Sequence, residues 1–245
     1  VDSSNGKDSL KRPAANVDDY PAMASFGDVP YFKVKSDRLV ELITHTIFSV
    51  ANDDPRIFLN GVNLETRDGN VLRMVSTDGH RLSLIDRTLD DPLRLTDPVI
   101  IPRKGVLELR KLLEEGSPEV ELAFSVSNGF FKWPGLLLVM RLIEGEFPDY
   151  NMVIPKSSDR KLKLNRQAFQ EALKRQTIAS AERSFGVRLV IAPGQLVIES
   201  SAPERGEGRS EIEADYAGEA MQVGFNAKYF LDSISVMAGD DVVLE

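Results

Sequence analysis

The chain has 245 residues, of which 42% are hydrophobic, and its formal net charge at pH 7 is −8. This length suffices for one large or two ordinary domains with sizeable cores, and the acidic balance argues against a protein that coats nucleic acid with its whole surface. The absence of cysteine excludes disulfides, thiolate metal sites and cysteine nucleophiles, and two histidines are too few for a histidine-rich metal centre.

The N-terminal segment, residues 1–29, is rich in Ser, Asp, Asn and Pro and has weak hydrophobic periodicity. We interpret it as the tail of a preceding domain. The sequence contains no long apolar run and no charged leader followed by an apolar stretch, which predicts neither a membrane span nor a signal peptide. The cytoplasm is therefore the expected compartment.

The next segment, residues 30–150, alternates predicted helices and strands. It begins with a helix over 36–48, for which Ser36 is the candidate N-cap and one stripe is apolar. A pair of apolar strands is expected between Phe58 and Ile85. The later elements are a strand, a helix ended by a glycine, and three further strands, over residues 99–101, 103–113, 120–124, 129–133 and 136–143.

A hexapeptide inside the strand pair, Thr77-Asp78-Gly79-His80-Arg81-Leu82, is the most informative short motif. An Asp-Gly pair between apolar strands predicts a two-residue type I′ turn, which needs positive φ at both central residues. His80 and Arg81 would then lie at a strand end, where they could bind a small ligand or a peptide. The alternative is a hairpin whose histidine and arginine only face water.

After residue 150 the same order of elements begins again. A helix over 166–180 follows the first helix by 130 positions, and the strands over 187–191, 195–200 and 223–225, with a helix over 226–237, repeat later elements at an offset near 124. Asp149-Tyr150, which closes the first copy, is preceded at 130 positions by Asp19-Tyr20. Such a repeat predicts an α+β protein of tandem units, with one unit over 30–150 and a second, lacking its final strands, over 151–245.

The predicted helices carry basic side chains opposite their apolar faces. In the helix over 166–180 Phe169, Ala172 and Leu173 share one side, whereas Lys174 and Arg175 fall on the other. Basic side chains on helices that pack against sheets suit sequence-independent contact with phosphates. Because interleaved aromatic residues are absent, duplex DNA is the better candidate than a single strand.

An enzymatic function is the first alternative. Asp78 and His80, with Arg81 beside them, could be imagined as the acid/base pair of a hydrolase or transferase, but no nucleophile or third orienting group is evident. Neither a Walker-type phosphate loop nor a dinucleotide fingerprint occurs, and no cofactor is expected. A peptide-binding scaffold that does not encircle DNA is the second alternative.

Five sequence blocks, in the same order, resemble the signature blocks of bacterial sliding clamps, the beta subunit of DNA polymerase III. The blocks are 59–61, 77–82, 99–106, 145–150 and 224–226 with Tyr229. The resemblance implies α+β clamp domains with two helices each facing a central hole and antiparallel sheets outside. It also implies that two crescent-shaped subunits close head to tail into a homodimeric ring around duplex DNA, with no catalysis of their own.

The same resemblance implies a cleft that receives short linear motifs from the polymerase III catalytic subunit, the clamp loader, other polymerases and repair proteins. Its apolar and polar positions carry over to Leu59, Thr77, Gly79, His80, Arg81, Leu82, Pro148, Met152, Val153, Asn226 and Tyr229. Met152 departs from the family pattern, because family members often carry an arginine there. Core packing is the alternative role for the apolar members.

Contacts with the DNA backbone are the second site that the resemblance implies. The expected residues are Arg56, Phe58, Arg103, Lys104, Lys174 and Arg175. Ile57 departs from the family, which often has an arginine followed by aromatic residues at this loop. The resemblance further implies that both helices of each unit lie on the same side of the sheets.

Overall fold

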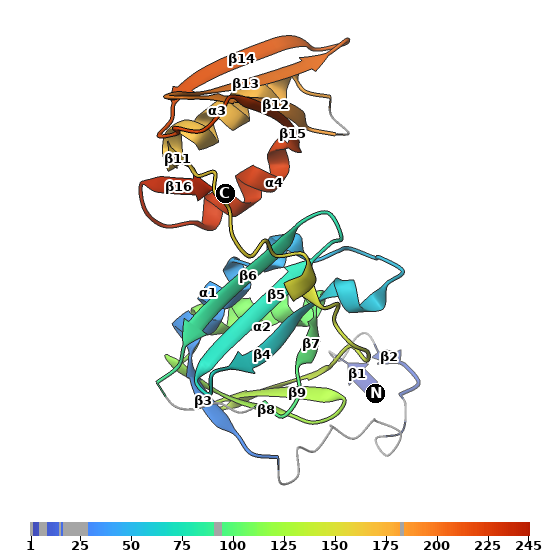
Figure 1. Cartoon of the computed structure of the whole chain (residues 1–245). Helices are drawn as coiled ribbons and strands as arrows, with labels where there is room; N and C mark the ends of the chain where they lie inside the picture. The colour runs from blue at the N-terminus through green and yellow to red at the C-terminus, as the bar shows by residue number, and fades with distance from the viewer. Residues whose placement is uncertain (1, 5–8, 15, 17–28, 91–94, 182–183) are drawn as a thin grey trace.

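The computed structural model describes residues 2–4, 9–14, 16, 29–90, 95–181 and 184–245. Within these ranges the chain forms two α+β units, each with its own hydrophobic core (Figure 1). A short ribbon of β1 (Asp2–Ser4) and β2 (Ser9–Lys11) precedes them. The predicted α+β fold class is confirmed. No helix among the described residues has the length and apolar character needed to cross a membrane.

The first unit places two helices against two antiparallel sheets. One sheet has the order β6-β5-β4-β7 and the other β10-β9-β8-β3. The elements are β3 (Phe32–Lys35), α1 (Ser36–Thr44), β4 (Gly61–Arg67), β5 (Val71–Thr77), β6 (Leu82–Thr88), β7 (Val99–Pro102), α2 (Arg103–Glu115), β8 (Glu119–Phe124), β9 (Asn128–Trp133) and β10 (Leu136–Arg141). Three short 3₁₀ helices complete it, η2 (Ile47–Ser49), η3 (Ile57–Asn60) and η4 (Tyr150–Met152).

The apolar stripes of α1 and α2 form the centre of this core. Leu39, Leu42 and Ile43 of α1 and Val106 and Leu109 of α2 are all nearly inaccessible to solvent. The N-cap assignment was wrong, because Lys35 occupies that position and no side chain caps the helix. Ser36 is already helical, and its hydroxyl donates to the carbonyl oxygen of Ser117 at 2.6 Å, which ties α1 to the loop that precedes β8.

The second unit repeats this plan. Its helices are α3 (Arg166–Ala179) and α4 (Ala227–Val236), and its larger sheet has the order β14-β13-β12-β15. The strands are β11 (Leu162–Asn165), β12 (Gly186–Ala192), β13 (Gln195–Ala202), β14 (Gly206–Glu213), β15 (Met221–Asn226) and β16 (Asp241–Leu244), with β11 paired to β16. Phe169, Ala172 and Leu173 of α3 are fully buried, as the helical spacing predicts.

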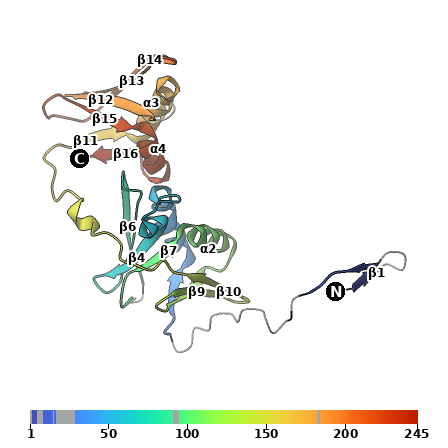
Figure 2. The same cartoon turned by 90° about the vertical axis from the view of Figure 1, so that its right-hand side faces the viewer.

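The internal repeat predicted from the sequence is present in the fold. The strand–helix pair β3–α1 begins at Phe32 and β11–α3 begins at Leu162, a step of 130 residues. The second helices begin at Arg103 and Ala227, a step of 124. α1 packs beside α2 and α3 beside α4, and Figure 2 shows α2, α3 and α4 on the same side of the sheets.

The predicted turn between Thr77 and Leu82 was wrong in type and length. Thr77 pairs with Leu82, so the loop has four residues, and of its members Gly79 has positive φ (85°) but Asp78 does not. The left-handed backbone at both residues of an Asp-Gly pair occurs instead in the β4–β5 hairpin, at Asp68 (φ 49°) and Gly69 (φ 85°). Three strands, β4, β5 and β6, occupy the region where a pair was predicted, and the sequence prediction also missed the short or charged strands β3, β11, β14 and β16.

Candidate functional site

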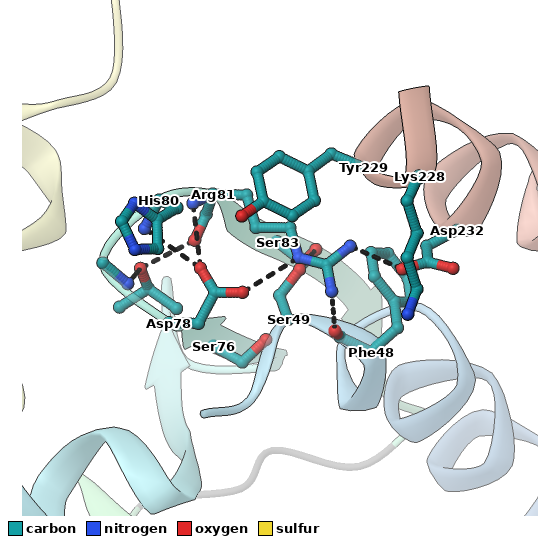
Figure 3. A network of polar contacts seen from close by, with 12 residues as sticks. Phe48, Ser49, Ser76, Asp78, His80, Arg81, Ser83, Lys228, Tyr229 and Asp232 are labelled. Atoms are coloured by element: carbon teal, nitrogen blue, oxygen red, sulfur yellow. Dashed lines mark hydrogen bonds and ion pairs between the residues drawn. The ribbon is translucent and has the colours of Figure 1, made fainter. Parts of the chain in front are cut away.

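The loop between β5 and β6 is closed by its own side chains. The Thr77 hydroxyl donates to the carbonyl oxygen of Arg81 at 2.7 Å and accepts from the Gly79 N–H at 3.0 Å. Oδ1 of Asp78 accepts from the N–H groups of His80 (3.0 Å) and Arg81 (3.1 Å). These bonds replace the missing ladder contacts, and they hold His80 at the tip of the loop (Figure 3).

A cleft of about 500 Å³ lies beside this loop. Eight of the eleven residues predicted for peptide binding line it together: Leu59, Thr77, Gly79, His80, Arg81, Leu82, Pro148 and Val153. The cleft combines an apolar surface with a few polar groups, which is the usual character of a ligand site. The lining comes from η3, the β5–β6 loop and the segment that connects the two units, so that three parts of the sequence far from one another form one site.

The other three predicted residues lie outside the lining of the cleft. Met152 is 83% exposed, on the solvent side of η4. The side-chain oxygen of Asn226 accepts from the Lys228 N–H at 2.9 Å and thereby caps α4. The Tyr229 ring lies over the guanidinium of Arg81, with 4.6 Å between the guanidinium carbon and the ring centroid. Asn226 and Tyr229 thus have structural contacts, and their role toward a peptide stays a prediction.

The Arg81 guanidinium connects the two units. Its Nε donates to Asp78 (3.1 Å), its Nη2 to the carbonyl oxygen of Phe48 (2.5 Å) and its Nη1 to Asp232 of α4 (2.6 Å). Figure 3 shows the guanidinium between these acceptors, below the Tyr229 ring. Three of its five N–H donors thus have partners within the chain, so Arg81 fixes the cleft's position relative to α4 and keeps one N–H on each terminal nitrogen for a ligand.

Arg56 and Phe58, predicted to contact DNA, also line this cleft. The Arg56 guanidinium forms a two-pronged ion pair with Asp54, in which Nε and Nη2 each lie 2.9 Å from a carboxylate oxygen. Its end lies 3.0 Å from the position that a Cβ atom on Gly79 would take, which favours glycine there. Because Asp54 neutralises Arg56, a phosphate would have to compete with an intramolecular carboxylate for this guanidinium.

We expect the Asp54 carboxyl to titrate far below the ordinary range for aspartate. Hydrogen bonds from the Arg56 side chain and then from its backbone N–H lower the pKa of Asp54 to about 2. This interaction therefore stabilises the loop above the unfolded-state pKa of about 4 and is lost as the pH falls through about 2. NMR of the carboxyl carbon should still detect ionised Asp54 at about pH 3. In Arg56→Ala the titration should return toward the ordinary value; an unchanged curve would contradict the assigned cause.

The remaining predicted DNA-binding residues lie on helices. Lys104 of α2 and Lys174 of α3 are exposed and form no ion pair with any residue that the structure describes. Arg175 is exposed and lies 3.9 Å from Glu171 on the same helix. Arg103 is half-buried, and its Nε is buried without a hydrogen-bond partner. Of the predicted DNA-binding residues, these two lysines are thus the most available for contact with a phosphate.

The geometry disfavours the acid/base pair considered for Asp78 and His80. Both carboxylate oxygens of Asp78 accept hydrogen bonds from the loop backbone or from Arg81, so the group is committed to the loop. His80 is exposed at the tip. In the described part of the chain no cluster of three His, Asp or Glu side chains is arranged to hold a metal ion.

Sequence reasoning missed Phe48, Asp232 and the role of Tyr150. Phe48 and Asp232 contact Arg81 from 33 and 151 positions away. The sequence separation leaves no local pattern that could identify them. The recurrence of Asp-Tyr at a step of 130 marked Tyr150 as part of the repeat. Its hydrogen-bond partners on β4 and β5 could not be predicted, because they depend on the register of these two strands.

Comparison with known proteins agrees with this architecture. Residues 33–149 match the model of the DNA polymerase III beta subunit central domain, and residues 151–245 match that of its C-terminal domain. The beta sliding clamp of Pseudomonas putida is 38% identical over 230 residues, covering 93% of this chain and 62% of the relative. The chain therefore spans less than two thirds of that relative's length.

Solved structures give the same result at the level of the fold. A Caulobacter crescentus beta sliding clamp superposes with a TM-score of 0.90 at 33% identity, over 99% of this chain and 66% of the other. A Pseudomonas aeruginosa sliding clamp bound to griselimycin has a TM-score of 0.87 at 33% identity, over 97% and 64%. With two consecutive domain models matched across most of its length, the chain belongs to the bacterial DNA polymerase III beta subunit family, the beta sliding clamps.

Proposed function

We propose that the chain acts as part of a sliding clamp of bacterial DNA replication, which tethers the polymerase to duplex DNA and has no catalysis of its own. In this proposal residues 30–150 and 151–245 are two consecutive clamp domains, and a homodimeric ring encloses the DNA. Topological enclosure permits weak contacts, because a closed ring cannot leave the DNA sideways. A net charge of −8 is therefore compatible with the function.

The placement of the helices carries this proposal. α2, α3 and α4 lie on one side of the sheets, with α1 beside α2 (Figure 2). Exposed Lys104 and Lys174 stand on two of these helices, one in each unit. Lysines at successive positions along one surface can contact the phosphate backbone without reading the sequence.

The cleft beside His80 supports the second half of the proposal, the capture of partner segments. Leu59, Leu82, Pro148 and Val153 provide apolar surface, while Thr77 and exposed His80 provide polar groups. We propose that short linear motifs of the polymerase III catalytic subunit, the clamp loader, other polymerases and repair proteins bind here. The Pseudomonas aeruginosa relative binds griselimycin, and we propose that this compound binds the cleft beside His80 here, which makes it a suitable probe.

Retention on circular DNA tests the enclosure. After incubation with the clamp loader, the protein should stay bound to a nicked circle through gel filtration, and it should be released when the circle is cut to a linear form. Equal retention on circular and linear DNA would contradict sliding. Binding of griselimycin without any retention on the circle would favour the scaffold that does not encircle DNA.

Removing Lys104 and Lys174 together should weaken the salt-dependent contact with DNA. Each phosphate contact contributes about 0.9 to the slope of log affinity against log salt, so Lys104→Ala with Lys174→Ala should reduce the slope by roughly 2. Fluorescence anisotropy on labelled duplex DNA at several salt concentrations measures this slope. The matched control is Lys33→Ala with Lys156→Ala, two exposed lysines on β3 and in the segment between the units that likewise form no ion pair with any described residue. Equal slopes for the two double variants would contradict the assignment.

A further inference from the structure

The segment between the two units has a single buried anchor. In residues 144–161, all of which the structure describes, Tyr150 is the only buried residue, and it is 5% exposed. Tyr150 and its neighbours Pro148, Asp149 and Val153 all line the cleft, and the three neighbours are exposed. A segment held at one point by a buried side chain is expected to keep its position only as well as that point is fixed.

The anchor ends in a polar network on the outer face of the β6-β5-β4-β7 sheet. The Tyr150 hydroxyl accepts from Nη2 of Arg67 (2.9 Å) and Nη1 of Arg73 (3.3 Å), and it donates to the Glu65 carboxylate. One donor and two lone pairs are the full hydrogen-bonding capacity of a phenol. Three charged groups therefore specify where this hydroxyl lies.

The charged side chains of this network are held in place by one another and by the sheet, independently of the segment between the units. Glu65, Arg73 and Asp86 are direct cross-strand neighbours on β4, β5 and β6. Both prongs of Arg73 lie 2.7 Å from the Asp86 carboxylate, and Arg67 lies 2.8 Å from Glu65. This alternation of acid and base holds the two arginines in place, so the Tyr150 hydroxyl meets a preorganised site.

We propose that Tyr150 is a positioning residue of the peptide cleft, because its hydroxyl fixes the part of the inter-unit segment that lines the cleft with Pro148 and Val153. We call this part, residues 148–153, the linker wall. The inference rests on the proposed peptide-binding function of the cleft. Asp149 assists by accepting from the Asn151 N–H at 3.1 Å, which closes η4 around the anchored tyrosine. Fixing this wall before binding removes the ordering cost that a mobile wall would add to each binding event.

Tyr150→Phe tests the hydroxyl while keeping the buried ring. We expect the affinity for griselimycin, measured by calorimetry, to fall by at least about threefold, since the variant loses hydrogen bonds to charged groups. The matched control is Tyr216→Phe, a buried tyrosine in the second unit whose hydroxyl donates to the carbonyl oxygen of Glu219 at 2.8 Å. Tyr216→Phe should bind griselimycin with the same affinity as the wild-type protein.

Two further measurements separate positioning from a general loss of stability. Amide hydrogen exchange without ligand should increase at residues 149–153 in Tyr150→Phe and stay unchanged in the strands. In double-mutant cycles Tyr150→Phe should couple with Val153→Ala on the linker wall and add independently with Leu82→Ala on β6.

The outcomes distinguish the two proposals. Unchanged affinity in Tyr150→Phe, or unchanged amide exchange at residues 149–153, overturns the positioning role. If the unchanged protein fails to bind griselimycin or the polymerase III catalytic subunit, the proposed function of the cleft is overturned instead. In that case the exchange experiment still decides whether the hydroxyl anchors the segment.

Discussion

Replacing Arg81 by alanine is expected to lower the free energy of unfolding by roughly 2–3 kcal/mol, because the change leaves three partly buried hydrogen-bond acceptors unpaired. The Arg81 and Asp232 side chains are only 17% and 27% exposed, so solvent screens their 2.6 Å ion pair weakly. The variant also loses the hydrogen bonds to Asp78 and to the Phe48 carbonyl oxygen. Urea unfolding followed by circular dichroism measures the change.

A surface ion pair of the same type supplies the control. Arg141 is 78% exposed and lies 3.0 Å from Glu144, so Arg141→Ala should change stability by less than about 0.5 kcal/mol. A cycle with Asp232→Ala should show a coupling of about 1 kcal/mol or more with Arg81→Ala. Strict additivity, or equal effects of Arg81→Ala and Arg141→Ala, would show that Arg81 does not connect the units energetically.

Leu59→Ala and Val153→Ala are expected to separate the fold from the cleft. Leu59 lines the cleft but is 2% exposed, so its truncation should cost about 2–4 kcal/mol of stability through lost burial and a cavity. Val153 is 70% exposed, and its truncation should leave stability within about 0.5 kcal/mol. Thermal unfolding of both variants measures this difference.

Val153→Ala should lower the affinity for the ligand although it leaves the stability of the fold nearly unchanged. Removing two methyl groups from an exposed wall should weaken griselimycin binding by roughly 3- to 10-fold if the bound ligand covers them. Leu82→Ala, which changes a half-buried residue on β6, serves as a second variant of the cleft. Binding by Val153→Ala equal to that of the unchanged protein would remove the linker wall from the site.

Local sequence patterns predicted the scaffold because hydrophobic periodicity acts over a few residues. Leu39, Leu42 and Ile43 of the helix predicted over 36–48 are buried in α1, as are Phe169, Ala172 and Leu173 in α3. The first helix was predicted too long, because α1 ends at Thr44 and half-buried Ile47 lies in η2. Elements with weak patterns were missed, since β14 contains three glutamates and two glycines and has no apolar alternation. Turn types were also not decided by the local sequence. Asp78-Gly79 and Asp68-Gly69 are the same dipeptide and predict the same turn, but the side-chain hydrogen bonds of Thr77 and Asp78 hold the loop at Asp78-Gly79 in a different conformation.

The residues of the cleft were carried over from the resemblance to sliding clamps, and eight of the eleven lie together. Their individual roles were harder to predict. Arg56 was assigned to DNA and Arg81 to a peptide, yet Asp54 and Asp232 pair with their guanidinium groups. A motif identifies a side chain, but its available hydrogen bonds depend on the neighbours that the fold supplies.

The sequence by itself determined the tandem α+β repeat, the helices and their buried faces, because these follow from the spacing of apolar residues along the chain. Only the tertiary structure decided which polar groups meet. Arg81 pairs with a carboxylate 151 residues away, and Tyr150 reaches a carboxylate 85 residues away. Such contacts depend on strand register and on the packing of one unit against the next, which no local spacing encodes.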